Sequence, residues 1–332
     1  MAHEFAEDRY DKMSYRRCGR SGLKLPAISL GAWETFGGYR GEDVARECFF
    51  RAFDLGITHF DLANNYGTPP GNAEIVCGKV VKDMPRDELI ISSKAGYHMW
   101  KGPYGEWGSR KYIIASCDQS LKRMGLEYFD IFYHHRPDPD TPLEETLGAL
   151  DQLVRQGKAL YVGVSNYSGA QYADAVRISE QRGYLPITIH QPYYNMLGRG
   201  IEWDLLPQTE RFGTGVIPFC PLASGILTDK YLGDSIPAVS RAAEKWGEGW
   251  VKGNLSPERL AVLNELNAMA KERGQTLAQM ALAWILRLPG ITSALIGASS
   301  AKQIEENVKA LENLTFTKEE LERIDKLTKP RP

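Results

Sequence analysis

The sequence lacks the features that mark several specialised classes of protein. Only five cysteines occur in 332 residues, widely spaced and without a Cys-x-x-Cys pair, which argues against a disulfide framework and against a zinc site. No apolar run approaches the roughly 20 residues that a membrane-spanning helix needs, and the first residues contain no apolar signal core. We therefore expect a cytoplasmic protein with reduced thiols that does not enter a membrane.

An excess of charge and the common nucleotide-binding motifs are lacking too. The sequence has 40 basic and 42 acidic residues, a formal net charge of −2, and without a basic block we expect no nucleic-acid partner. The signatures Gly-x-Gly-x-x-Gly and Gly-x4-Gly-Lys-Ser/Thr are absent, so neither a Rossmann site nor a P-loop is indicated. His59 shares a strand face with Asp61, but no His-x-His pair occurs. A metal-dependent barrel hydrolase is therefore disfavoured, and we expect no bound metal.

The sequence does contain a regular alternation of strand-like and helix-like segments. Nearly continuous apolar segments, typical of parallel strands covered by helices, begin at Ala27, His59, Leu89, Phe129, Ala159, Ile187, Gly215 and Ser293. The segments between them have helical periodicity, and several open with a capping pattern, including those at Thr141, Ser168, Thr276 and Ser300. This order predicts an α/β fold, a single (β/α)8 TIM barrel over residues 1–332, with a doubly wound sheet as the alternative.

Three features predict additions to the plain barrel. Residues 16–26, with Gly19 and Gly22, predict an N-terminal β-hairpin across the barrel floor. Residues 224–255 follow the seventh strand without clear periodicity, and a loop of this length in a compact domain is more often a functional lid than a linker. The helical pattern near the end of the chain, beyond the eighth strand, predicts extra helices.

Polar side chains at the ends of the strands predict the position of a site. In a barrel of this kind the catalytic groups lie at the carboxyl ends of the strands. Asp61 and Lys94 each interrupt an apolar strand, and because an isolated charge there would be costly, we expect them to form an ion pair. A purely structural pair is the alternative. The remaining strand ends contribute His135, Ser165, Asn166, Gln191 and Gly297–Ser300.

Tyr66 indicates what the ion pair could do. It lies in the loop ANNYGTPPG after Asp61, from which its hydroxyl can return to the barrel mouth. An adjacent Lys94 ammonium would lower the pKa of the phenol from its ordinary value of about 10, and Asp61 would keep that lysine cationic. His135 would donate a hydrogen bond to the same substrate oxygen, while His134 faces the opposite side of its strand. These residue types predict a general acid directed at a carbonyl group.

A phosphate site is predicted at the start of the last barrel helix. Ser299 and Gln303 lie there, where free backbone N–H groups and the helix dipole favour an anion. Lys230 and Arg241, in the loop after the seventh strand, could close over the same anion. Taken singly, each of these residues is better explained as an ordinary helix cap or surface charge.

A series of longer motifs links the chain to a known family. FDLANNYG, IISSKAG, DIFYHHRPD, YVGVSNYS, IHQPYYN, FCPLASGILTDKY and LIGASSAKQIEEN occur in this order at compatible spacing. On these motifs the chain resembles the aldo-keto reductases over nearly its whole length. The resemblance implies a catalytic tetrad of Asp61, Tyr66, Lys94 and His135 with Tyr66 as the acid. Within the family, KAGYHMWKGPYGEWGSRKY and SLKRMGLEYFDIFYHHRPD resemble the bacterial L-glyceraldehyde 3-phosphate reductases, and the chain is also similar to the β subunits of voltage-gated potassium channels.

The resemblance further implies NADPH or NADP+ as the cofactor, extended across the barrel mouth. The residues implied near the nicotinamide and the pyrophosphate are Trp33, Asp61, Ser165, Asn166, Gln191, Phe219, Cys220, Pro221, Leu222, Ala223, Ser224 and Gly225. Those implied at the adenosine end are Lys230, Arg241, Gly297, Ser299, Gln303, Glu306 and Asn307. Within that group the resemblance assigns Lys230, Arg241, Ser299 and Gln303 to the 2′-phosphate.

The reaction implied is the NADPH-dependent reduction of small aldehydes, such as L-glyceraldehyde 3-phosphate or methylglyoxal, to alcohols. The candidate substrate contacts are Trp33, Tyr66, Tyr97, Trp100, His135 and Arg136. Arg136 would meet a substrate phosphate, unless it faces outward. The alternative function is a cofactor-sensing subunit with little turnover; the channel β subunits have Asn at the position of His135, which favours the enzyme. Relatives often assemble, so a homo-oligomer is implied by analogy.

Overall fold

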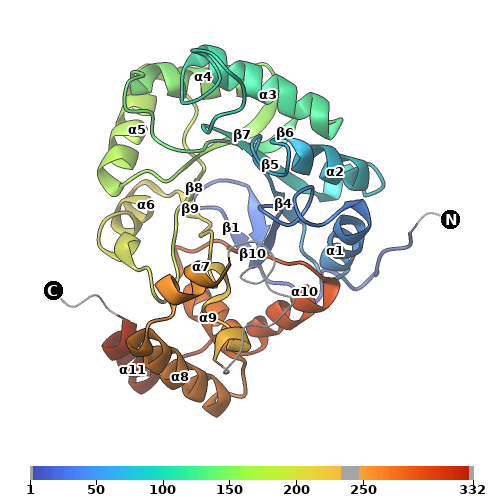
Figure 1. Ribbon diagram of the computed structural model, residues 1–332. Helices are drawn as coiled ribbons and strands as arrows, with labels where there is room; N and C mark the ends of the chain where they lie inside the picture. The colour runs from blue at the N-terminus through green and yellow to red at the C-terminus, as the bar shows by residue number, and fades with distance from the viewer. Residues whose placement is uncertain (1–2, 233–246, 329–332) are drawn as a thin grey trace.

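Parallel strands form a closed sheet at the centre of the molecule (Figure 1). The computed structural model describes residues 3–232 and 247–328. Around the sheet the strands are β10 (Ala294–Gly297), β3 (Ile28–Gly31), β4 (His59–Asp61), β5 (Ile90–Ala95), β6 (Phe129–His134), β7 (Ala159–Ser165), β8 (Ile189–Gln191) and β9 (Gly215–Val216). The sheet closes because Thr292 N–H donates to Val216 O at 2.8 Å and Leu295 N–H donates to Pro218 O at 3.1 Å. The predicted barrel is confirmed, and the doubly wound alternative is wrong.

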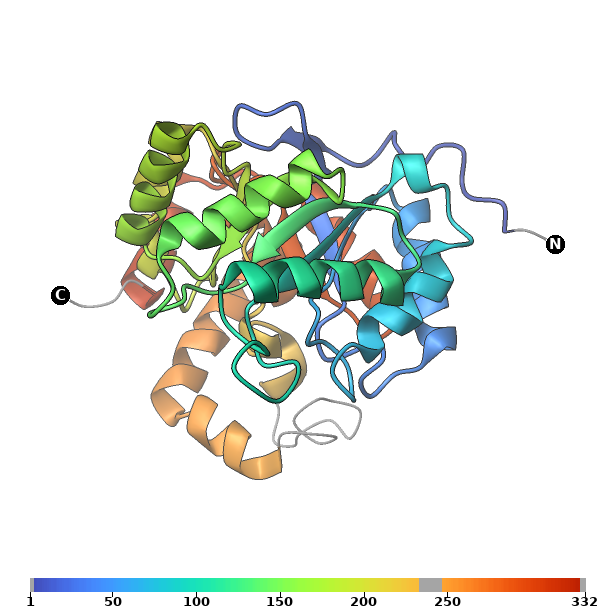
Figure 2. The ribbon, with the colours of Figure 1, turned by 90° about the horizontal axis from the view of Figure 1, so that it is seen from above.

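Helices surround this sheet (Figures 1 and 2). Those that complete the barrel repeats are α1 (Glu42–Asp54), α2 (Asn72–Val81), α3 (Arg110–Met124), α4 (Leu143–Arg155), α5 (Gly169–Arg182), α6 (Leu206–Phe212), α9 (Leu277–Leu286) and α10 (Ala301–Val308). The additional helices are α7 (Gly247–Asn254), α8 (Pro257–Glu272) and α11 (Lys318–Thr328). Because every strand is parallel to its neighbours, all the carboxyl ends meet at one edge of the barrel.

The helix starts follow the capping patterns in most places. Ser168 and Thr276 form the full capping boxes that the sequence predicts, each exchanging hydrogen bonds with the glutamine three residues later. The pattern at Thr141 is wrong, because α4 begins after Pro142. Asp138 Oδ1 accepts the Thr141 N–H at 3.2 Å, so that residue belongs to a turn before the helix.

The predicted hairpin is confirmed and closes one end of the barrel (Figure 2). β1 (Tyr15–Arg17) and β2 (Lys24–Pro26) pair antiparallel, with Arg16 opposite Leu25. Leu23 and Leu25 pack against apolar side chains inside the barrel, namely Ile131, Tyr133, Ile189, Ile217 and Leu295. This end is therefore sealed by apolar contacts, and the other end is available for a site.

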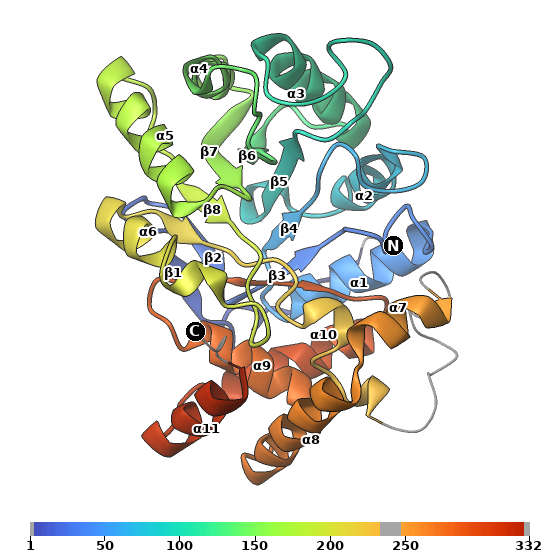
Figure 3. The ribbon, with the colours of Figure 1, turned by 60° about the vertical axis from the view of Figure 1, so that its left-hand side comes forward.

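The segment after β9 has more regular structure than the sequence indicates. Ala223–Gly225 and Asp229–Tyr231 form short 3-10 turns, and α7 begins at Gly247. The helix was not predicted because its sequence GEGWVKGN contains three glycines, which are weak helix formers. Residues 233–246, including the predicted phosphate contact Arg241, lie outside the described residues. Figure 3 shows α7 and α8 on the side of the barrel that carries α9 and α10.

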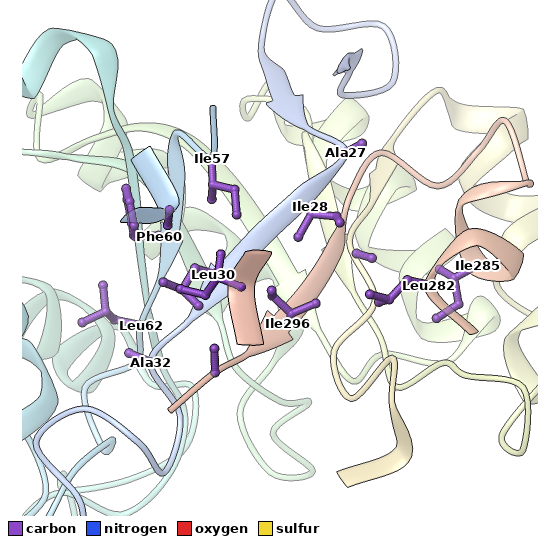
Figure 4. Close-up of a cluster of buried hydrophobic side chains, with 14 of the residues drawn as sticks. Ala27, Ile28, Leu30, Ala32, Ile57, Phe60, Leu62, Leu282, Ile285 and Ile296 are labelled. Atoms are coloured by element: carbon purple, nitrogen blue, oxygen red, sulfur yellow. The ribbon is translucent and has the colours of Figure 1, made fainter. Parts of the chain in front are cut away.

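The outward-facing side chains of the strands form the main hydrophobic core (Figure 4). Ile28 and Leu30 of β3 and Phe60 of β4 are buried and belong to one cluster with helix side chains such as Leu282. Burying each of these side chains contributes about 1.5–3 kcal/mol. Successive strand residues point to opposite faces, so the same packing turns Asp61 toward the barrel interior.

Candidate active site

A cavity of about 840 Å³ opens at the carboxyl ends of the strands. Most of the predicted site residues lie on its wall, namely Trp33, Asp61, Tyr66, Tyr97, His135, Asn166, Gln191, Phe219, Cys220, Pro221, Leu222, Ser224, Gly225, Lys230, Gly297, Ser299, Gln303, Glu306 and Asn307. Lys94 and Ser165 are buried and hydrogen-bond to residues of that wall. The structure therefore brings the predicted strand-end residues to one place.

Asp61 and Lys94 form the predicted ion pair. Lys94 Nζ lies 2.5 Å from Asp61 Oδ2 and donates to the backbone oxygen of Leu62 at 2.6 Å. Both side chains are buried, that of Lys94 completely. Burial lowers the pKa of Lys94, and the charge of Asp61 opposes that shift. The carboxylate is therefore what favours an ammonium group in this buried position.

The second carboxylate oxygen of Asp61 is held by two neutral donors. Ser92 Oγ donates to Oδ1 at 2.6 Å, and Gln191 Nε2 donates to the same oxygen at 3.2 Å. Sequence reasoning missed Ser92. Its position two residues before Lys94 on β5 was the available signal, because such residues share a strand face. Side chains of β5 and β8 thus fix a carboxylate at the end of β4.

Tyr66 lies beside this ion pair. Its ring centroid is 5.1 Å from Lys94 Nζ, and the His135 ring lies edge-on to it at a centroid distance of 5.9 Å. Burial raises the pKa of Tyr66 well above its ordinary value, and the charge of Asp61 adds to the shift. The predicted lowering of this pKa is wrong, because burial dominates and the charge of Asp61 acts in the same direction. The phenol therefore carries its proton at neutral pH.

His135 is neutral. Burial lowers its pKa well below the ordinary value, and the Lys94 charge acts in the same direction. The ring also lies edge-on to Tyr97, with centroids 4.7 Å apart. A neutral imidazole keeps one N–H that it can donate to a ligand. His134 faces the other way, as predicted, and its Nδ1 hydrogen-bonds with the Tyr167 hydroxyl at 2.7 Å.

Ser165, Asn166 and Gln191 form a connected group at the ends of β7 and β8. Ser165 Oγ donates to Gln191 O at 2.8 Å, and Asn166 Nδ2 donates to His135 O at 3.0 Å. Asn166 has a φ of 61°, a left-handed conformation that asparagine tolerates better than most residues. Amide side chains both donate and accept hydrogen bonds. The group is therefore suited to a ligand with a carboxamide.

The loop after β9 has an unusual backbone where it borders the cavity. Cys220, Ala223 and Ser224 have φ values of 53°, 48° and 59°, in the left-handed region that such residues seldom adopt. Strained backbone of this kind is often found at ligand-binding sites. Phe219 offers an aromatic side chain on the same wall, whereas Ala223 itself is buried in the hydrophobic core.

The far end of the cavity lies at the start of α10. Ser300 caps this helix, but Gln303 Oε1 accepts the Ser299 N–H at 2.9 Å, so the predicted capping box is only half formed. Lys230 and Lys302 are both on the wall. Two ammonium groups near a helix N-terminus suit an anionic ligand. Lys302 was not predicted, although it directly follows the start of the helix.

Two predicted substrate contacts are not among the described residues of the wall. Trp100 packs against the hydrophobic core instead. The Arg136 guanidinium carbon lies 4.2 Å from the ring centroid of Tyr97 and 3.7 Å from that of Trp107, and the side chain pairs with Glu106. The charge of Arg136 therefore fastens the loop after β5.

Sequence reasoning missed wall residues in the loops after β3 and β4. Tyr39, Arg40 and Asn65 all line the cavity. Each follows the carboxyl end of a strand, which was the signal that could have found them. Arg40 adds a third cationic side chain to the wall.

Three further observations concern metals, membranes and disulfides. Within residues 3–232 and 247–328, no three His, Cys, Asp or Glu side chains gather as ligands of a metal ion would. In the same part of the chain, every helix is too short or too polar to cross a bilayer. No disulfide joins the five cysteines, all of which are described.

Comparisons with known proteins agree on one family. The family model described as "Aldo/keto reductase family" matches residues 27–329. An Escherichia coli (strain K12) protein named L-glyceraldehyde 3-phosphate reductase is 53% identical over 324 residues, which cover 96% of this chain and 93% of the relative. A Schizosaccharomyces pombe protein named putative voltage-gated potassium channel subunit beta is 40% identical over 324 residues, covering 94% and 92%. A rice protein named probable voltage-gated potassium channel subunit beta is 35% identical over 326 residues, covering 96% and 98%.

Proposed function

The chain belongs to the aldo/keto reductase family, and from this premise we propose that it reduces small aldehydes to alcohols with NADPH. The observation that carries the proposal is a protonated phenol, Tyr66, beside the buried Lys94–Asp61 pair on the wall of a cavity of about 840 Å³. A structural ion pair alone would not require an ionisable hydroxyl next to it. The neutral ring of His135 on the same wall completes a group that can protonate a carbonyl oxygen.

The wall residues fit an extended dinucleotide phosphate. Asn166 and Gln191 would hold the carboxamide, and Phe219 would stack on the nicotinamide ring. At the far end, Lys230 and Ser299 would hold the 2′-phosphate, because an ammonium group and a helix N-terminus both favour a dianion. When bound, the reduced nicotinamide supplies the hydride that the carbonyl carbon receives.

Tyr66 supplies the proton. Because its pKa is raised, the phenol keeps its proton until a stronger base forms beside it, and the substrate oxygen becomes such a base as the carbonyl is reduced. The Lys94 ammonium then faces the phenolate that remains, and an opposite charge nearby stabilises it. Asp61 balances the lysine before and after this transfer.

His135 orients the substrate. Its pKa lies well below the ordinary value, so the ring remains neutral over the physiological pH range and does not compete with Tyr66 as an acid. It can still donate one hydrogen bond to the carbonyl oxygen. We assign it binding and polarisation of that oxygen.

L-Glyceraldehyde 3-phosphate and methylglyoxal are the first substrates to test. The E. coli relative is named for the first of them. The cavity wall combines the aromatic rings of Trp33 and Tyr97 with the guanidinium of Arg40, a mixture that suits a short, polar or anionic aldehyde. Arg136 is not assigned to the substrate, because it pairs with Glu106.

A cofactor-sensing subunit with little turnover is the second candidate function. It is favoured by the similarity to proteins named as potassium channel β subunits. Such a subunit would bind NADPH in the same cavity without oxidising it at a useful rate. The two candidates therefore differ in the fate of the bound cofactor.

Single-turnover mixing separates them. The protein is loaded with NADPH and mixed in a stopped-flow instrument with each aldehyde, while cofactor absorbance is followed. We expect oxidation by the unaltered protein and by Tyr133→Phe, and oxidation at least about 100-fold slower by Tyr66→Phe. Tyr133 is the matched control, because its ring centroid lies 5.7 Å from Lys94 Nζ but its side chain packs in the barrel interior. Cofactor that stays reduced with every aldehyde would refute the reductase and support the sensing subunit.

A further inference from the structure

A chain of buried polar side chains inside the barrel leads to the active-site carboxylate. It runs from Ser293 to Ser29, His59, Ser92 and Asp61, with donor–acceptor distances of 2.6, 2.9, 3.0 and 2.6 Å. All of these side chains are buried. A cluster of apolar and aromatic side chains also lies inside the barrel and includes Ile131, Tyr133, Ile189, Ile217 and Leu295. The polar chain begins at Ser293, directly before β10, and continues through side chains of β3, β4 and β5.

The carboxylate fixes the direction of every hydrogen bond in this chain. Asp61 Oδ1 can only accept, so Ser92 Oγ donates its single proton to it. Ser92 Oγ must then accept from an N–H at His59 Nε2. A neutral imidazole has one N–H, so Nδ1 accepts from Ser29 Oγ, which in turn accepts from Ser293 Oγ. All the donors point toward the carboxylate.

His59 is neutral in this environment. Burial lowers its pKa to about 4; the Asp61 charge opposes the shift, and the Lys94 charge adds to it. A protonated ring would donate from both nitrogens and would reverse the bonds to Ser29 and Ser293. The direction of the whole chain thus depends on a neutral ring with its proton on Nε2.

We propose that His59 is a positioning residue for the reduction, acting on Asp61 through Ser92. The inference rests on the proposed function. By donating to Ser92 Oγ, the ring polarises the hydroxyl that binds Asp61 Oδ1, and hydrogen bonds in such chains strengthen one another. The last bond ends on a charge, where hydrogen bonds are roughly twice as strong as between neutral groups. Asp61 fixed in this way keeps Lys94 cationic beside Tyr66.

Other ionisable groups also face this carboxylate. Lys94 from β5, Tyr66 from the loop after β4 and Tyr133 from β6 interact with its charge. Glu74 from α2 and His135 at the end of β6 interact with Lys94, and Cys220 from the loop after β9 interacts with Tyr66. Among the described residues, Lys94 is the one ionisable side chain within hydrogen-bond distance of Asp61. A substitution at His59 leaves all of these groups in place, so their electrostatic effects on Asp61 are the same in every His59 variant.

The pH dependence of kcat tests this role. His59→Asn removes the donor to Ser92, whereas His59→Gln places an amide N–H close to the former Nε2 position. Without the donor, Asp61 holds the Lys94 ammonium less firmly, so the pKa of Lys94, which burial already lowers, falls further and the basic limb of the kcat profile moves to lower pH by about one unit. We expect His59→Asn to lower kcat up to about tenfold on the basic limb of the profile and much less at pH 6, with the dissociation constant of NADPH unchanged within about twofold. His59→Gln should restore most of the loss.

His190→Asn is the matched control. His190 is also completely buried in a barrel strand, and its ring lies edge-on to Tyr167 and Tyr172, away from the polar chain. Its loss removes the same volume and should leave the shape of the kcat profile unchanged. A uniform loss of kcat at all pH values in His59→Asn, without rescue by glutamine, would reduce His59 to a structural role and overturn the proposal.

Nitrogen-15 NMR of histidine-labelled protein tests the chain without any turnover. The His59 signals are assigned by their absence from His59→Asn. We expect the Nε2–H tautomer, unchanged between pH 8 and pH 5.5. An Nδ1–H tautomer, or titration of the ring in that range, would overturn the proposal. If the unaltered protein binds NADPH but reduces no aldehyde, the proposed function fails instead, and an Nε2–H tautomer would still establish the direction of the chain.

Discussion

Replacing Asp61 by asparagine removes the charge that faces a completely buried ammonium group. Lys94 Nζ keeps the Leu62 carbonyl oxygen at 2.6 Å but loses the carboxylate at 2.5 Å. Removing one partner of a buried pair typically costs about 3–5 kcal/mol. Lys94 can limit this cost by releasing its proton. At pH 7 this release costs at most about 4.6 kcal/mol, which is the difference between the ordinary lysine pKa of about 10.4 and pH 7, multiplied by about 1.36 kcal/mol per pKa unit. We expect Asp61→Asn to lower the free energy of unfolding by about 3–4.5 kcal/mol at pH 7.

The destabilisation of Asp61→Asn also depends on pH. In the variant, the pKa of Lys94 is lower in the folded protein than in the unfolded chain. Between those two pKa values the unfolded chain binds more protons, so the free energy of unfolding rises with pH by up to about 1.4 kcal/mol per unit. The unaltered protein has a smaller slope, because Asp61 opposes the lowering of the lysine pKa. The difference in stability between the two proteins should therefore shrink from pH 7 to pH 9.

Urea unfolding at pH 7, 8 and 9 measures both effects. Lys94→Met and the double variant Asp61→Asn with Lys94→Met complete a double-mutant cycle. The double variant has no buried charge left unpaired, so it should lose at least about 2 kcal/mol less than the sum of the single losses. Asp174→Asn, which breaks an exposed pair with Arg177 at 3.1 Å, should leave stability unchanged. Additive losses that do not vary with pH would show that Asp61→Asn does not leave Lys94 as an unpaired buried charge.

The remaining predictions concern turnover and binding. Tyr66→Phe should lower kcat by about 10²–10⁴-fold with NADPH affinity nearly intact; a parallel loss of affinity in fluorescence titrations would speak against a proton donor. Arg136→Met releases the loop that carries Tyr97 and should raise the KM for aldehydes about fivefold with little change in kcat, whereas weaker NADPH binding would place Arg136 on the cofactor. Lys230→Ala should weaken NADPH about tenfold more than NADH, and equal weakening would remove it from the 2′-phosphate site.

The fold was predictable because the strands are buried on both faces. β6 illustrates this, since every residue of Phe129–His134 is buried, and its sequence is accordingly almost continuously apolar or aromatic. The predictions failed where two local structures compete for the same residues. Asp138 binds the backbone N–H of Thr141, so the threonine lies in a turn rather than at the start of α4. Its sequence pattern contains no sign of that competition.

The sequence predicted which residues gather at the candidate site, but not their electrostatics. Strand ends identified the carboxylate, the lysine and the histidine, yet the direction of the Tyr66 pKa shift depends on burial, which the sequence does not state. Adjacent serines show the same limit. Ser92 donates to Asp61 at 2.6 Å, whereas Ser93 donates to Glu74 at 2.6 Å on the other face of the strand. Only the register of β5 decides which serine belongs to the site.

The raised pKa of Tyr66 changes how the proposed acid would work. A phenol with a pKa near 7 would be about half ionised at neutral pH, and about half of the molecules would have no proton to donate. With its raised pKa, the buried phenol of Tyr66 stays protonated at neutral pH and releases the proton only to a strong base, such as the alkoxide oxygen of a carbonyl that has just been reduced. Proton transfer is then tied to reduction. The phenolate that results lies in the same low-dielectric environment, where an ammonium group at short range is most effective. The Asp61–Lys94 pair therefore stabilises the phenolate formed by proton transfer more than it affects the protonated phenol.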